Sequence, residues 1–236
     1  MKRSLYALCL ILFAVLSCRL PQINLFNKVD EGNEYDLKMD NSYFAGLGCF
    51  ESPDCLPEEL KNLEDPIGII SEPGDMFGGL TPSVPLAVAM TVRHDDETIP
   101  AVYVKRCLSK GYVRYLVVVD GEMRLIDSLE GLAMQFAPID SEEEALSYAI
   151  AATGFSAVND LRKSPKPKLY ADTVEETFVK PVDGGYVVHL FDTYLCGCGP
   201  HIVPSVDVTV LKDGSIELSE PVDAFSDPKL DGMCID

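Results

Sequence analysis

A stretch of alternating apolar residues near the C-terminus constrains this chain most. Residues 186–211 read YVVHLFDTYLCGCGPHIVPSVDVTVL, with apolar side chains recurring at every second position around a central Cys-Gly-Cys-Gly-Pro-His segment. Such alternation is the pattern of β-strands, whose successive side chains point to opposite faces of a sheet. The stretch predicts two strands, the first covered on both faces and the second buried on one face.

Turn signals extend this pair into a larger sheet. Asp183-Gly184 precedes the first strand and Asp213-Gly214 follows the second. Asp-Gly pairs favour tight hairpin turns, because these need residues with positive φ. Strand-like residues 174–182 and 215–222 lie beyond the two turns. The C-terminal half therefore predicts an antiparallel meander of about four strands.

The preceding part of the chain combines further strands with one strong helix. Residues 84–92, 101–107 and 112–119 are rich in β-forming side chains. Ser141 and Glu144 match a capping box, and Gly154 fits the C-cap of a helix that begins at residue 141. We therefore expect an α+β fold in which an antiparallel meander packs with one main helix. A division into two lobes, 44–136 and 137–236, stays open.

The order of these elements is similar to that of PepSY and cystatin-like domains. The helix reads S-x-E-E-A-x-x-x-A and is followed by the meander, over residues 140–222. The resemblance rests on element order without a diagnostic motif. It implies a sheet wrapped around a helix, and a secreted or membrane-tethered module that binds or inhibits.

The N-terminus has the parts of an export signal. Lys2 and Arg3 precede a short apolar run at residues 6–16, and the small residue Ser17 comes next. The run is shorter than the ~20 apolar residues of a comfortable membrane-spanning helix. An uncleaved anchor is the alternative. We expect residues 1–17 to be a signal peptide.

Val15-Leu16-Ser17-Cys18 resembles the lipobox of bacterial lipoproteins. The resemblance implies cleavage before Cys18 and attachment of acyl chains to that residue, and hence a membrane partner reached through the lipid. Val15 stands where that family usually has Leu, and ordinary cleavage after Ser17 would leave Cys18 as a thiol. Because Arg19 follows instead of the Asp of inner-membrane retention, the resemblance implies the outer membrane of the bacterial cell envelope if the source is Gram-negative.

The segment after Cys18 is polar and acidic and shows little periodicity. Such composition is typical of flexible chain. We predict a lipid-anchored flexible tether over residues 18–43 and a globular domain over residues 44–236.

The charge of the chain argues against nucleic acid as a partner. The formal net charge is −19, and removing residues 1–17 takes away two cations and no acid. Phosphate backbones require a basic surface. The usual hydrolase and metalloprotease motifs are absent from the sequence, and three histidines limit acid–base chemistry. We predict no catalytic residues and no cofactor, and we favour a non-enzymatic role.

The cysteines predict a disulfide framework. If Cys9 leaves with the signal and Cys18 is lipidated, an even number remains, as export requires. They are Cys49, Cys55, Cys107, Cys196, Cys198 and Cys234. Cys49 and Cys55 flank a bend at Pro53 and should pair. Cys196 and Cys198 are too close to pair with each other, so one should hold Cys107 and the other Cys234. The sequence leaves open which takes which.

A metal site is the alternative for the Cys196–His201 segment. Cys196, Cys198 and His201 place two thiolates and an imidazole within six residues, which are ligands for Cu(I) or Zn²⁺. The spacing is Cys-x-Cys rather than Cys-x-x-Cys, so disulfides are the favoured interpretation. The sequence thus predicts an exported, lipid-anchored binding or interaction protein with a protein or small-molecule ligand. The alternative function is a periplasmic metal-binding or thiol-redox protein.

Overall fold

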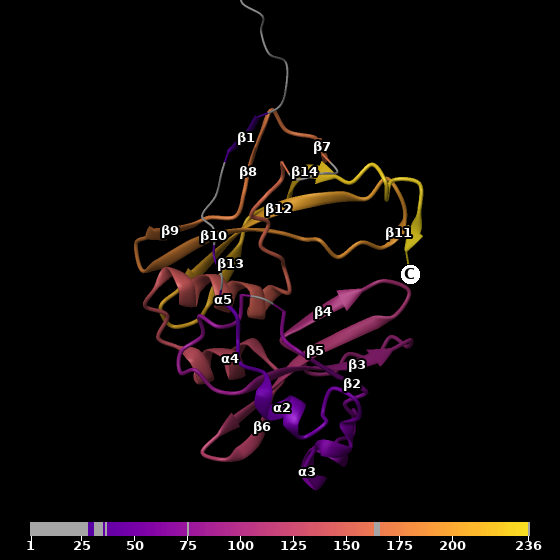
Figure 1. The fold of residues 1–236 in the computed structure, drawn as a ribbon, viewed down its shortest axis with the longest axis vertical. Coiled ribbons are helices and arrows are strands. Elements are labelled where there is room, and N and C mark those ends of the chain that lie inside the picture. Colours follow the sequence, from indigo (N-terminus) through magenta and orange to yellow (C-terminus); the bar gives the residue numbers. More distant parts are fainter. Residues whose placement is uncertain (1–27, 31–34, 36, 75, 163–165, 236) are drawn as a thin grey trace, which may run out of the picture.

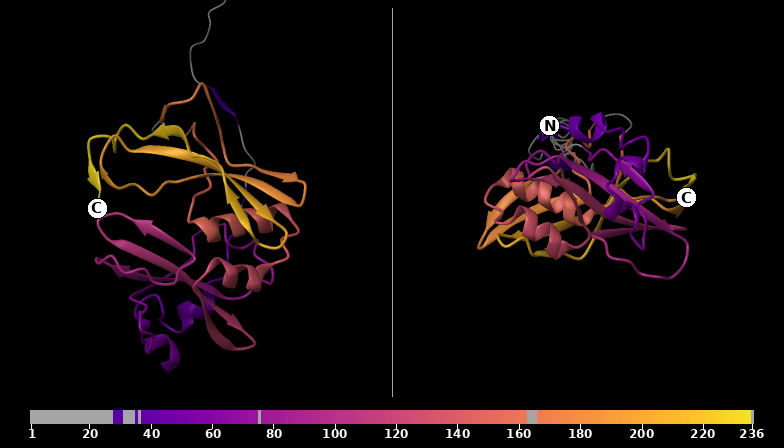
Figure 2. Two further views of the ribbon diagram at one scale, coloured as in Figure 1. Left: turned by 180° about the vertical axis from the view of Figure 1, so that it is seen from behind. Right: turned by 90° about the horizontal axis from the view of Figure 1, so that it is seen from below.

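The computed structural model describes residues 28–30, 35, 37–74, 76–162 and 166–235. It confirms an α+β fold with antiparallel sheets (Figure 1). The described helices are α2 (Ser42–Gly46), α3 (Glu58–Lys61), α4 (Leu129–Phe136) and α5 (Glu142–Thr153). Helices α4 and α5 lie between two sheets, and the view from behind in Figure 2 shows the same layering. The core is therefore a helical layer covered by strands on both sides.

The first sheet comes from the N-terminal half of the chain. Its strand order is β2-β3-β5-β4, and β6 pairs with the other end of β5. The strands are β2 (Ile69–Ser71), β3 (Leu86–Arg93), β4 (Tyr103–Arg106), β5 (Lys110–Val119) and β6 (Glu122–Ile126). Asp120 and Gly121 have φ values of 53° and 81° and form the tight turn between β5 and β6. This turn joins β5 and β6 into an antiparallel hairpin.

The second sheet comes from the C-terminal half. Its order is β7-β14-β12-β10-β9, with β13 also paired to β12. The strands are β7 (Lys168–Leu169), β9 (Val179–Val182), β10 (Gly185–Phe191), β12 (Ile202–Leu211), β13 (Ile216–Leu218) and β14 (Val222–Ser226). The meander β9-β10-β12-β13 matches the prediction. The strand expected from Tyr186 ends at Phe191, because the Asp192 carboxylate accepts the N–H of Tyr194 and turns the chain.

Helix α5 joins the two sheets. Its capping box forms as expected, with Ser141 accepting from the Glu144 N–H and the Glu144 carboxylate accepting from the Ser141 N–H. Gly154 ends the helix in the left-handed conformation. The helix is buried continuously from Ala145 to Ala152 rather than along one stripe, because sheets cover both of its sides.

One apolar core spans the helical layer and both sheets. It includes Val113 and Val117 of β5, Leu132 of α4, and Val188 of β10. A second cluster fills the other face of the first sheet, where Phe44 and Leu56 from the N-terminal segment cover Leu116. The same N-terminal segment forms one wall of a surface groove.

Within residues 18–43, the range expected to form a flexible tether, the residues that the structure describes contact the domain. β1 (Lys28–Asp30) pairs in parallel with β8 (Thr173–Glu175). Tyr35, Leu37 and Met39 are half-buried against the main core, and the Leu37 carbonyl accepts the Gly78 N–H. The three side chains alternate with polar residues, as in an extended segment with one apolar face. Cys18 lies outside the described residues.

Candidate functional site

The six cysteines of the globular part form three disulfides. Cys49 pairs with Cys55, Cys107 with Cys196, and Cys198 with Cys234. This confirms the predicted framework and resolves the choice that the sequence left open. The Cys107–Cys196 bond ties the end of β4 to the segment after β10, so it links the two halves. The Cys198–Cys234 bond joins the short strands β11 (Gly197–Cys198) and β15 (Cys234–Ile235).

The segment from Cys196 to His201 pins the C-terminal tail. His201 is buried, and its backbone N–H donates to the Asp231 carboxylate at 3.3 Å. The N–H at Nε2 of the His201 ring donates to the carbonyl oxygen of Met233 at 3.0 Å. The Gly199 N–H also donates to Met233. The role of His201 in this structure is therefore to hold the tail.

The metal alternative for Cys196, Cys198 and His201 does not fit this arrangement. Both sulfurs are bonded to other cysteines, and a disulfide sulfur is not a thiolate ligand. His201 already uses Nε2 on a backbone carbonyl. Across the described ranges, no group of three or more His, Cys, Asp or Glu side chains is placed to hold a metal ion.

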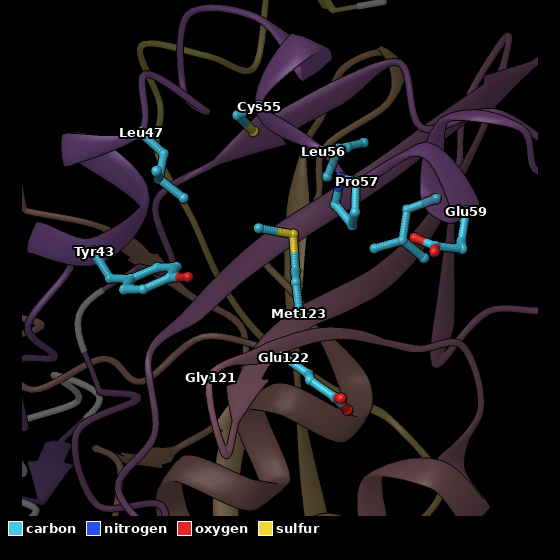
Figure 3. Close-up of a pocket in the computed structure, with 10 residues that line it drawn as sticks. Tyr43, Leu47, Cys55, Leu56, Pro57, Glu59, Gly121, Glu122 and Met123 are labelled. Atoms are coloured by element: carbon cyan, nitrogen blue, oxygen red, sulfur yellow. The ribbon is translucent and has the colours of Figure 1, made fainter.

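A surface groove of about 620 Å³ lies at the end of the molecule that carries α2, α3 and β6. Its lining residues come from the N-terminal segment and from the β5–β6 hairpin. They are Tyr43, Leu47, Cys55, Leu56, Pro57, Glu59, Leu60, Gly121, Glu122 and Met123. Figure 3 shows Met123 pointing into the space between the α2 side, with Tyr43 and Leu47, and the Leu56–Pro57 side.

The two walls of the groove are held by different constraints. On the N-terminal wall, the Cys49–Cys55 disulfide closes a loop between α2 and α3, and Cys49 and Leu56 are buried in the second apolar cluster. On the opposite wall, the turn at Asp120 and Gly121 sets the position of Met123. Because both walls are fixed by covalent or backbone geometry, the groove is preformed.

The groove exposes apolar side chains beside acidic ones. Tyr43 is 39% exposed and Leu47 is 50% exposed, although both are large and apolar. The charged lining residues are Glu59 and Glu122, and the Glu122 carboxylate lies 3.2 Å from the guanidinium of Arg124. Among the residues that the structure describes, none forms an ion pair with Glu59, so this residue supplies the negative charge of the lining. Apolar surface bordered by charge is typical of a protein-binding surface.

Sequence reasoning placed the framework cysteines but missed the groove. Cys55 is the one predicted site residue that lines it. Tyr43 falls where the tether was expected to end, and Met123 lies in β6, where the sequence carries no functional signal. A groove made of segments some 60 to 80 residues apart leaves no spacing motif in the sequence.

Comparisons with known proteins give no relative. No family model, no curated protein and no solved structure matches this chain. The lipobox resemblance and the PepSY and cystatin-like resemblance therefore stay predictions. Among the residues that the structure describes, no helix is long and apolar enough to cross a membrane.

Proposed function

We propose that this protein is an exported, lipid-anchored interaction module of the bacterial cell envelope, and that it binds a protein partner in the groove of Figure 3. The partner segment inserts apolar side chains beside Tyr43, Leu47 and Met123. A Lys or Arg next to them faces Glu59. The observation that carries the proposal is the preformed groove with exposed Tyr43 and Leu47.

The composition of the groove supports a protein ligand. Aromatic residues and Met are enriched at protein interfaces, and in this groove Tyr43, Leu47 and Met123 lie together beside polar residues. A volume of about 620 Å³ accommodates several side chains of a peptide. The acidic charge of the chain favours a basic partner segment and speeds its encounter.

The disulfides and the N-terminal sequence support the location. Three disulfides are compatible with an oxidising compartment. Cys18 precedes β1 by ten residues, which span at most ~35 Å when extended. β1 lies at the opposite end of the molecule from α3 and β6 (Figures 1 and 2). A lipid on Cys18 would then leave the groove on the side away from the membrane.

A random peptide library displayed on phage tests the groove directly. Panning against the oxidised protein should enrich peptides that combine large apolar residues with Lys or Arg. Leu47→Asp should weaken the binding of the selected peptides roughly tenfold or more, because it places a charge on the apolar wall. Glu59→Gln should weaken the basic peptides by a smaller factor.

Leu108→Asp is the matched control, because Leu108 is 79% exposed at the turn between β4 and β5, away from the groove. It should leave peptide affinity unchanged. Selected peptides that bind Leu47→Asp as tightly as the parent protein would refute the groove as the binding surface. Failure to enrich any peptide with apolar and basic residues would refute the proposed partner chemistry.

A further inference from the structure

A second hollow lies on the outer face of the second sheet, on the opposite side from the helices. It has a volume of about 340 Å³, and its lining includes residues of β8, β10, β12 and β14. Its polar lining residues are Thr173, Glu175, His189, Ser205 and Asp223. None of them lines the groove of Figure 3. The two sites are therefore separate.

The imidazole of His189 is held in one orientation. Its Nδ1 lies 2.6 Å from the Asp207 carboxylate on the neighbouring strand β12. The ring of Phe178 stacks on it at 5.0 Å with an interplanar angle of 6°, and Phe191 meets it edge-on at 5.2 Å. The side chain of His189 is 12% exposed. An imidazole fixed from three sides keeps one direction for its remaining nitrogen.

The Asp207 contact decides what His189 offers to a ligand. An ionised carboxylate can only accept, so the hydrogen of this bond lies on Nδ1 of the imidazole. In the neutral ring, Nε2 then carries a lone pair and acts as an acceptor. Among the described residues, Nε2 of His189 has no hydrogen-bond partner, and the ring lines the hollow.

The other charged groups around the hollow are also acceptors. Glu175, from β8, and Asp223, from β14, are exposed carboxylates that line it, and no Lys or Arg belongs to its described lining. The cation Lys180 does not line the hollow, and its ammonium group lies over the ring of Phe178, 3.6 Å from the ring centre. Two carboxylates and an imidazole lone pair together accept hydrogen bonds from a positively charged donor.

We propose that this hollow binds a small organic cation with several N–H donors, a linear diamine or polyamine. One ammonium group donates to Nε2 of His189 and to Glu175, and a second group reaches Asp223. The hydroxyl groups of Thr173 and Ser205 lie beside the chain that joins them. A volume of about 340 Å³ is at the small end for ligand sites, which suits a slender aliphatic chain.

Calorimetric titration of the oxidised, full-length mature protein with putrescine and spermidine tests the proposal. Both amines should bind, and tetramethylammonium should not, because it carries the charge without N–H donors. Glu175→Gln with Asp223→Asn should weaken spermidine binding roughly a hundredfold, a factor of about ten for each charge-assisted hydrogen bond. His189→Phe keeps an aromatic ring in the stack and should weaken binding roughly tenfold.

Asp183→Asn is the matched control, since Asp183 is an exposed carboxylate in the turn between β9 and β10 and does not line the hollow. It should leave spermidine affinity unchanged. Equal losses in Asp183→Asn and Glu175→Gln would show attraction to the acidic surface in general and overturn the site. Binding of tetramethylammonium as tight as that of putrescine would also overturn it. Leu47→Asp should bind spermidine normally, so failure of the groove proposal and failure of this one are distinguishable.

Discussion

The hydroxyl group of Tyr115, on β5, donates a 2.8 Å hydrogen bond to the carbonyl oxygen of Ala151, on α5. Tyr115 is fully buried, so this bond connects the first sheet to the helical layer without access of solvent. Tyr148 makes the corresponding connection to the second sheet, where its hydroxyl donates to the Gly214 carbonyl at 2.7 Å. The two bonds hold α5 between the sheets and thereby fix the halves of the molecule relative to each other.

Replacing either tyrosine by phenylalanine should destabilise the fold. Tyr115→Phe leaves the Ala151 carbonyl without its side-chain donor, and Tyr148→Phe does the same to Gly214. We expect each change to lower the free energy of unfolding by about 1–2 kcal/mol, the cost of an unsatisfied buried acceptor. Urea unfolding followed by circular dichroism measures it. Tyr43→Phe, at an exposed position, should have no effect, and an equal loss there would contradict this account.

The same two tyrosines predict an alkaline transition. Burial raises the pKa of Tyr148 to about 12, and it raises the pKa of Tyr115 well above that of an exposed tyrosine. Because the folded state keeps these protons, the stability they contribute is fully present below the unfolded pKa of about 10. It is lost as the pH rises from there through about 12.

Tyrosinate absorbance measures this transition cleanly, because the chain has ten tyrosines and no tryptophan. Tyr115 and Tyr148 should ionise together with loss of the circular dichroism signal. Ionisation of Tyr115 and Tyr148 near the ordinary pKa, with the fold intact, would contradict the buried hydrogen bonds.

The three disulfides should differ in what they contribute. Cys107 and Cys196 are 89 residues apart, whereas Cys49 and Cys55 are six apart. The chain-entropy model gives about 4–5 kcal/mol for the longer loop and about 2 kcal/mol for the shorter one. Urea unfolding of the double variants Cys107→Ala/Cys196→Ala and Cys49→Ala/Cys55→Ala measures the difference. A larger loss from the Cys49–Cys55 pair would show that packing of the N-terminal segment outweighs loop closure.

Lipid attachment should depend on Cys18. Acyl chains on this residue should place the protein in the membrane fraction, since each buried methylene contributes ~0.8 kcal/mol. Cys18→Ser should yield precursor or soluble protein instead. Mass spectrometry of the mature N-terminus is the decisive measurement, and an unmodified Cys18 there would end the lipoprotein proposal. The Cys49→Ala/Cys55→Ala variant controls for general effects of cysteine loss on export.

Local patterns in the sequence were sufficient for much of the fold. The Ser141 and Glu144 capping box, the Gly154 C-cap and the Asp-Gly turns depend on residues within a few positions of each other. A high content of β-forming residues predicted β5, and alternation predicted the β10–β12 pair. Spacing also predicted the Cys49–Cys55 pair, whereas the structure decided that Cys196 bonds to Cys107 and Cys198 to Cys234. These features are set by short-range geometry and by the redox chemistry of export.

Tertiary structure alone decided the rest. The sequence did not reveal that Tyr35, Leu37 and Met39 pack against the core, because so short an alternation in a polar segment does not show which surface it covers. It gave no sign that Tyr43 and Met123 face one groove, since they come from opposite walls. It predicted that His189 lies in a strand, but it did not predict that the register between β10 and β12 places this residue opposite Asp207. Contacts between distant segments depend on how sheets pack around α5, and no local pattern encodes that packing.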